Sequence, residues 1–291
     1  MQRTSRPAFL VMILILILPA MLSAQSFWLE RSAGKSLGLE LFKPSFDNST
    51  LVFNRGEYYP VDFSFKTFAV FLSTRWPVGS KTFGVAELPF AHAEFDTEID
   101  QEFSFYRNSG HESMIGNPYV GFEFGGISSP FFAEVGVRLP LVAEDYSYAL
   151  RAGVSADGDR PEAFIDFAAV KVALNYQRRG EAGLIFRFRL GAAYLRKSGD
   201  MISGRGFTIT PAARIGYKTG RISAGAFMIL PGEHRIVSTA SRGLGFMNRG
   251  ANTNLRVSGQ AGLWANIDLG SLQPGVYVSD SFDINFGVQL R

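Results

Sequence analysis

The amino-acid sequence predicts an all-β fold, an up-and-down antiparallel transmembrane β-barrel of about twelve strands. Three observations lead to this prediction. Apolar and polar residues alternate with a period of two over segments longer than ordinary soluble strands. The links between these segments alternate between long and short, as loops and turns do in a membrane barrel. After residue 24, no apolar run approaches the roughly 18 residues that a membrane-spanning helix needs.

The composition agrees with a folded chain rich in strands. Hydrophobic residues make up 46% and charged residues 19%, which excludes a disordered or collagen-like protein. The 27 phenylalanines and 31 glycines favour strands, because aromatic rings suit a pleated surface and glycine supplies turns. There is no cysteine, so disulfides, zinc–thiolate sites and thiol nucleophiles are excluded. A formal net charge of +3 is too small to indicate nucleic-acid binding.

The first segment, residues 1–24, has the three parts of a secretory signal peptide. Arg3 and Arg6 form the basic start, residues 9–18 form an apolar core, and a small-residue cleavage site follows. The alternative is an uncleaved membrane anchor, but the apolar core is short for a helix that must cross roughly 30 Å. We therefore expect a cleaved signal peptide and a single barrel domain over residues 25–291.

The clearest alternation lies in residues 252–269. Every odd position there is uncharged and most are apolar, whereas the even positions carry polar groups such as Arg256, Gln260 and Asp268. The end of the chain, residues 282–290, repeats the pattern. Such regularity over 18 residues predicts a strand long enough to cross a membrane, since ordinary strands hold about 5 or 6 residues.

The same pattern identifies the remaining strands. Twelve are predicted, at 37–46, 61–78, 82–95, 114–125, 129–142, 164–177, 183–196, 208–218, 222–230, 252–269, 274–279 and 282–290. The links between them hold 14, 3, 18, 3, 21, 5, 11, 3, 21, 4 and 2 residues. This alternation predicts short periplasmic turns, long extracellular loops and both termini in the periplasm.

An exported soluble β-sandwich or lipocalin-like barrel would show the same period, with the apolar face turned inward. Two features favour the membrane barrel. The uncharged face is broad and nearly continuous, as a hydrocarbon environment requires. Aromatic residues with polar tips also fall on the apolar face near predicted strand ends, where they would form an interfacial girdle: Trp76, Tyr176, Tyr194 and Tyr217.

One pair of strands carries a recognisable motif. Residues 115–124 read Ile-Gly-Asn-Pro-Tyr-Val-Gly-Phe-Glu-Phe, and after a short turn residues 131–140 end in Arg-Leu-Pro. In this motif the chain resembles the outer-membrane β-barrels of Gram-negative bacteria, and among them the porin-like transporters associated with aromatic meta-cleavage pathways. The resemblance implies outer-membrane lipids and the barrel assembly machinery as partners. Unlike the usual member of that class, the chain ends on Arg291 rather than on an aromatic residue.

The polar residues give no sign of an enzyme, a metal site or a cofactor site. The three histidines, His92, His111 and His234, lack the spacing of metal ligands. The sequence Asp157-Gly158-Asp159 resembles the start of a calcium loop but lacks the remaining ligands and the closing glutamate, so we interpret it as a polar turn.

The charged residues on the polar parity are the candidate functional residues. If the apolar parity faces lipid, three acidic residues point into the lumen: Glu94, Glu123 and Glu134. Six basic residues do the same: Arg138, Lys171, Arg187, Arg189, Arg214 and Lys218. They would either pair across the lumen and fill it, or line a narrow pore with a transverse field that orients polar solutes.

These alternatives give two candidate functions for an outer-membrane protein. The first is a passive channel or transporter for small solutes, with the long loops at 96–113, 143–163 and 231–251 folded inward. The second is a closed structural or surface-interaction barrel without transport activity. Neither requires a cofactor, and no nucleic-acid partner is expected.

Overall fold

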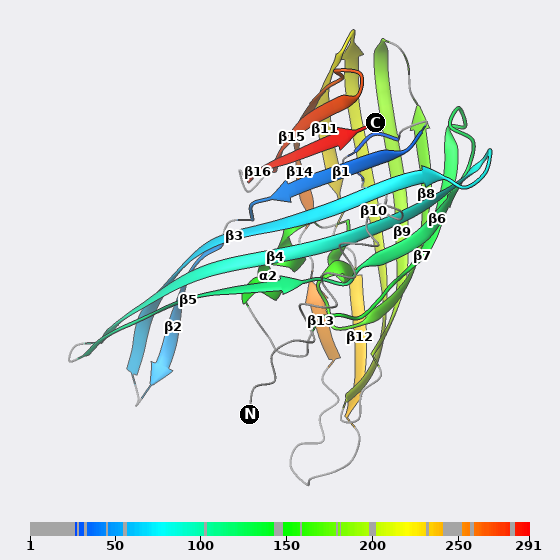
Figure 1. The fold of residues 1–291 in the computed structure, drawn as a ribbon. Coiled ribbons are helices and arrows are strands. Elements are labelled where there is room, and N and C mark those ends of the chain that lie inside the picture. The colour runs from blue at the N-terminus through cyan, green and yellow to red at the C-terminus, as the bar shows by residue number, and fades with distance from the viewer. Residues whose placement is uncertain are drawn as a thin grey trace, which may run out of the picture.

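The computed structural model shows the chain as a β-barrel (Figure 1). The described residues are 27, 29–31, 34–44, 46–54, 57–101, 104–142, 148–157, 159–178, 180, 182–197, 202–230, 233–240, 252–256, 259–279 and 283–291. The predicted signal peptide, residues 1–24, lies outside them. Among the described residues, no helix has the length and apolar character needed to cross a membrane.

Twelve antiparallel strands close the barrel, which confirms the predicted fold class. The first strand pairs with the last, so that Leu37 lies opposite Leu290. Their order around the barrel follows the chain, as an up-and-down topology requires. The strands are β1 (Ser36–Phe42), β3 (Glu57–Pro77), β4 (Thr82–Gln101), β6 (Tyr119–Phe124), β7 (Phe131–Arg138), β8 (Ala168–Arg178), β9 (Gly183–Lys197), β10 (Ile202–Thr219), β11 (Ile222–Ile229), β14 (Gln260–Ile267), β15 (Leu272–Ser279) and β16 (Ile284–Leu290).

Short turns join the strands at one end of the barrel, here called the short-turn end. The tightest is the two-residue turn between β10 and β11, where Gly220 has a φ of +54°, a conformation that glycine adopts without steric cost. Strand β1 begins at this end, because Ser36 lies opposite Arg75 near the end of β3. Strand β16 ends there as well, so long and short links alternate around the barrel until the last one, between β15 and β16, which is short.

Four further strands continue the hairpins past the other end, here called the long-loop end (Figure 1). They are β2 (Phe46–Asn54) beside β3, β5 (Ser104–Ile115) beside β4, β12 (Glu233–Ala240) beside β10, and β13 (Asn252–Arg256) beside β12. The loops predicted at 96–113 and 231–251 are therefore partly strand. The sequence of these two segments lacks the apolar stripe by which the barrel strands were identified, so the period of two did not mark them as strands.

Two predicted strands are interrupted. The strand predicted over 252–269 is divided into β13 and β14, and the one predicted over 114–125 is divided into β5 and β6. At the second break, Ile115 lies opposite Phe90 and Tyr119 lies opposite Glu87, so one strand advances four residues while its partner advances three. This is the geometry of a β-bulge, and Pro118, which has no N–H to donate, lies within it.

The two faces of the wall differ in polarity as predicted for a membrane barrel. Along β1, residues alternate strictly between buried and exposed, and the exposed ones are Leu37, Leu39 and Leu41. Large apolar side chains are exposed on the outer face of the other strands as well, among them Phe122, Leu174 and Leu263. The predicted girdle residues Trp76, Tyr176, Tyr194 and Tyr217 lie on this outer face.

The chain itself fills the lumen. The link between β7 and β8 holds a helix, α2 (Tyr148–Ala156), and a 3-10 turn, η2 (Pro161–Ala163), and it is here called the lumen loop (residues 139–167). Its Phe164 packs in one buried cluster with wall residues from opposite sides of the barrel, including Phe71 of β3 and Phe227 of β11. Phe27, from the N-terminal segment, belongs to the same cluster. Two separate segments therefore plug the barrel.

Candidate functional site

Eight of the nine predicted lumen residues lie on the inward face of their strands. Seven of them are almost fully buried: Glu123, Glu134, Arg138, Lys171, Arg187, Arg189 and Arg214. Lys218 is half-buried near the short-turn end. The predicted acidic and basic side chains, apart from Glu94, therefore surround the plug inside the barrel.

Glu94 is the exception, and its predicted inward position is wrong. The pairing of β3 with β4 continues without a shift, with Ala91 and Ala93 facing inward, so Glu94 faces outward and its side chain is 58% exposed. The prediction failed because the inward face of β4 is itself apolar here. Ala91 packs in the cluster around Phe164. The two faces of β4 therefore do not differ in polarity here, and the assignment of inward and outward faces depended on that difference.

The middle of the lumen holds a network of buried ion pairs between the wall and the lumen loop. Arg138 lies 2.6 Å from a carboxylate oxygen of Glu87, on the wall, and 3.2 Å from one of Glu162, in the loop. Lys171 lies 2.6 Å from the same Glu162 carboxylate. Glu162 thus links two cations of different strands, and burial of all four groups strengthens their mutual attraction.

Arg160 is the cation that the lumen loop contributes to this network. It lies 3.1 Å from a carboxylate oxygen of Glu40 and 2.5 Å from one of Asp157, and it also donates to Glu87. The guanidinium group stacks 4.0 Å from the ring centroid of Phe71. Arg160 therefore joins the loop to strands β1 and β4 through two wall carboxylates, those of Glu40 and Glu87.

Asp157 and Asp159, from the predicted polar turn, are buried and lie beside cations of the protein. Asp159 lies 3.3 Å from Arg189, and its backbone carbonyl accepts a hydrogen bond of 3.1 Å from Lys171. Arg189 also lies 3.8 Å from Glu134. Among the described residues, no group of three or more histidine, aspartate or glutamate side chains is arranged to hold a metal ion.

The pKa of Glu162, a residue of the loop rather than of a strand, shows how strongly the network holds its charges. Burial alone would raise this pKa, but the nearby charges of Lys171 and Arg138 outweigh that effect and lower it to about 2. The carboxylate therefore stays ionised at neutral and mildly acidic pH. The cations around it remain neutralised over the same range.

A second cluster ties the N-terminal segment to the wall. Arg31 lies 2.5 Å from a carboxylate oxygen of Glu123, and Arg75 lies 2.8 Å from the same oxygen. Arg31 also donates to the backbone carbonyls of Gly125 and Gly126, in the turn between β6 and β7. These contacts hold the N-terminal segment inside the barrel near the short-turn end.

The bulge between β5 and β6 clamps the lumen loop in place. The side-chain oxygen of Asn117 accepts hydrogen bonds from the backbone of Leu141 and Val142. Its side-chain nitrogen donates to the backbone carbonyls of Glu162, Ile165 and Phe167. At Gly116 a Cβ atom would lie 2.5 Å from the carbonyl oxygen of Ala163, so the loop passes too close for any other residue. The motif that carried the family resemblance therefore holds the plug.

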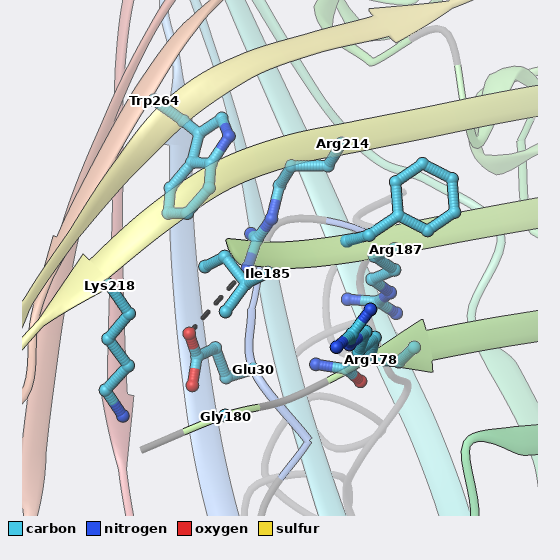
Figure 2. A pocket seen from close by; sticks show the side chains of 10 residues that line it. Glu30, Arg178, Gly180, Ile185, Arg187, Arg214, Lys218 and Trp264 are labelled. Atoms are coloured by element: carbon cyan, nitrogen blue, oxygen red, sulfur yellow. Dashed lines mark ion pairs between the residues drawn. The ribbon is translucent and has the colours of Figure 1, made fainter. Parts of the chain in front are cut away.

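A pocket opens at the short-turn end, beside the buried network (Figure 2). It has an empty volume of about 400 Å³, including the part open to solvent. Strands β8, β9, β10 and β14 and the N-terminal segment supply its polar and aromatic lining: Glu30, Gln177, Arg178, Arg187, Arg214, Lys218 and Trp264. Three of the predicted basic residues thus meet at this pocket, away from the carboxylates of the lumen loop.

The alternation of apolar and polar residues did not identify several residues of this site. Glu40 lies on the inward parity of its predicted strand, so parity identifies it in principle. Glu87 lies on the opposite parity from Glu94, so the assignment that placed Glu94 inward placed Glu87 outward. Arg160 and Glu162 lie in a link with no periodicity, and their only signal is the density of charge between residues 157 and 162. Arg31 precedes the first predicted strand and carries no signal at all.

Comparison with known proteins supports the fold. No protein-family model matches the chain, and no curated protein matches it. Among solved structures it is similar to the COG4313 outer membrane channel from Pseudomonas putida F1, with a TM-score of 0.54 and 11% identity over 92% of this chain and 98% of that one. The transport unit of the autotransporter AIDA-I from Escherichia coli gives a TM-score of 0.41 and 11% identity, over 100% of this chain and 98% of that one.

Proposed function

We propose that the protein is an outer-membrane channel or transporter for small solutes, with a lumen closed by the lumen loop and the N-terminal segment. The observation that carries the proposal is the charged character of the wall behind this plug. Ten buried charged side chains of the described strands point inward: Glu40, Arg75, Glu87, Glu123, Glu134, Arg138, Lys171, Arg187, Arg189 and Arg214.

A lumen that stays closed does not need these charges. Replacing buried ion pairs by well-packed apolar residues is often neutral or stabilising, by about 1–4 kcal/mol. A charged wall is useful where water and polar solutes must be solvated after the plug moves. The plug contacts the wall through the apolar cluster around Phe164 and through ion pairs and hydrogen bonds, and water can replace the polar contacts when the loop is displaced. The similar barrel from Pseudomonas putida F1 is an outer membrane channel, which supports the same role here.

The test is to weaken the plug without altering the wall. Arg160→Gln removes the loop cation that binds Glu40 and Glu87, and we expect it to raise the conductance of planar bilayers well above that of the wild type. Arg196→Gln makes the same chemical change on the exposed outer face of β9 and serves as the matched control. If the wild type and a folded Arg160→Gln variant, checked by heat-modifiability on gels, both fail to conduct, the channel proposal is wrong.

The same preparation tests the localisation. We propose that residues 1–24 direct export and are removed, that outer-membrane lipids surround the apolar face, and that the assembly machinery inserts the barrel. The protein should then sediment with the outer membrane and begin at Gln25 on N-terminal sequencing. Recovery in the soluble periplasmic fraction would contradict the membrane assignment.

A closed surface-interaction barrel is the second candidate, and the long-loop end favours it. There β2, β5, β12 and β13 extend the sheet past the barrel and offer edges and faces to a partner (Figure 1). This function predicts a barrel that never conducts, even with a weakened plug. The conductance experiment therefore separates the two candidates.

A further inference from the structure

The pocket at the short-turn end differs from the rest of the lumen in its charge. Among the described residues, its lining holds four cations, Arg178, Arg187, Arg214 and Lys218, and one carboxylate, that of Glu30. Figure 2 shows these side chains gathered around one opening. An excess of positive charge beside low-dielectric walls attracts anions, because the field is poorly screened there.

Two of the four cations form no hydrogen bond or ion pair with the other described residues. Arg178 is exposed and makes no hydrogen bond or ion pair with them, and the same holds for Lys218, whose charge nevertheless acts on the more distant Asp268 carboxylate. Arg187, by contrast, donates to the backbone carbonyls of Phe27 and Leu29, at 2.8 and 2.9 Å. Arg178 and Lys218 are therefore available to a ligand that enters from the open side.

Glu30 already places a carboxylate in this pocket. Its oxygens lie 3.8 Å from Arg214 and 3.6 Å from Arg291, longer than the roughly 2.7–2.9 Å of a well-formed charge-assisted hydrogen bond. Its backbone carbonyl accepts a hydrogen bond of 2.8 Å from Gln289, which anchors the segment to β16. The Glu30 carboxylate is thus held in place by its backbone. A free anion could approach Arg214 and Arg291 more closely than these two ion pairs do.

The wall beside Glu30 is apolar. The Arg214 guanidinium stacks 4.1 Å from the centroid of the Trp264 ring, and Ile185 lines the same side of the pocket. An anion with a short apolar tail would place its charge at Arg214 and its tail against Ile185 and Trp264. An inorganic anion would leave that apolar surface exposed to water.

We propose that this pocket binds small monocarboxylates with a short apolar tail, in competition with the Glu30 side chain. The carboxylate takes the place of the Glu30 carboxylate near Arg214 and gains Lys218 as a second cation. This goes beyond the proposed transport function, since binding at the pocket requires no conduction. When the ligand binds, the N-terminal segment loses its ion pair with Arg214, although the hydrogen bond from Gln289 remains.

The experiment is titration calorimetry of the detergent-solubilised full chain with butyrate as the probe and 1-butanol and sulfate as comparisons. Glu30→Gln removes the competing charge and should tighten butyrate binding about tenfold, which corresponds to about 1.4 kcal/mol. Lys218→Gln should weaken it several-fold, because a cation that faces the ligand is lost. Lys81→Gln is the matched control, an exposed lysine of another short turn at the same end of the barrel.

The proposal is supported if Glu30→Gln tightens binding, Lys218→Gln weakens it, Lys81→Gln leaves it unchanged, and 1-butanol does not bind. Sulfate that binds as tightly as butyrate overturns the assignment to monocarboxylates. Unchanged affinity in Glu30→Gln overturns the competition with Glu30. If Glu30→Gln is recovered unfolded, the Lys218→Gln and Lys81→Gln pair still decides, since an equal loss in both variants would show a general effect of net charge.

Discussion

The middle of the lumen and the pocket at the short-turn end use the same residue types in opposite ways. In the middle, each wall cation meets a carboxylate of the lumen loop, with Arg138 and Lys171 on Glu162 and Arg189 on Asp159. In the pocket, cations outnumber carboxylates, and Arg178 has no partner among the described residues. Paired charges hold the plug, whereas unpaired charges near solvent are available to a ligand.

This difference has an energetic reason. A buried ion lacks hydration, so removing its partner leaves an uncompensated charge that destabilises the fold. An ion at an open mouth keeps part of its hydration, so it tolerates the absence of a partner. The position of a charge along the barrel axis therefore decides whether it contributes to structure or to binding. Substitutions in the two regions should separate these roles.

The largest expected effect comes from removing a cation of the middle region. Arg138→Gln leaves the buried carboxylates of Glu87 and Glu162 with fewer compensating charges, which should lower stability by about 3–5 kcal/mol. Arg178→Gln at the exposed mouth should change stability little. Denaturant unfolding in detergent, monitored by heat-modifiability on gels, measures the stability of both variants. Equal stability of the two variants would show that the distinction between the regions is wrong.

A smaller effect is expected where the wall clamps the loop without charge. Asn117→Ala deprives two backbone N–H groups and three carbonyls of their side-chain partner. Water can occupy the space of the lost side chain and satisfy most of these groups, so stability should fall by about 1–3 kcal/mol, the cost of one group left buried and unsatisfied. Because the loop would then keep its ion pairs and its apolar cluster but lose the Asn117 clamp, conductance should also rise. Proteolysis of the lumen loop in intact liposomes provides the second measurement. Asn175→Ala, on the inward face of β8, is the matched control. A loop that stays protected in Asn117→Ala would show that the ion pairs and the apolar cluster hold the plug without the Asn117 clamp.

The wall of the barrel was predictable from sequence and the plug was not. Strands such as β8 and β9 present one apolar face to the outside, and a period of two identifies both faces from sequence alone. The lumen loop has no such period, and its place in the barrel depends on contacts between distant residues, such as Arg160 with Glu40. The plug also explains the error at Glu94, because its apolar cluster against β4 makes the inward face resemble a lipid-facing one. Long-range packing thus removed the very signal from which the faces were assigned.

The smallest expected effect is a change of stability with pH. It tests the comparison between the middle of the lumen and the pocket through one charge of the middle region, that of Glu162. The pKa of Glu162 in the folded protein is about 2, below the value of 4.5 for an ordinary glutamate, because the attraction of Lys171 and Arg138 outweighs burial. A lowered pKa means that the charge of Glu162 contributes its full stability above about pH 4.5 and loses it as the pH falls towards 2. The difference in unfolding midpoint between the wild type and Glu162→Gln should therefore be constant from pH 7 to pH 5 and shrink below that range. A difference that already shrinks between pH 7 and pH 5 would mean that Glu162 is not held by the two cations, and that the middle of the lumen is as open to water as the pocket.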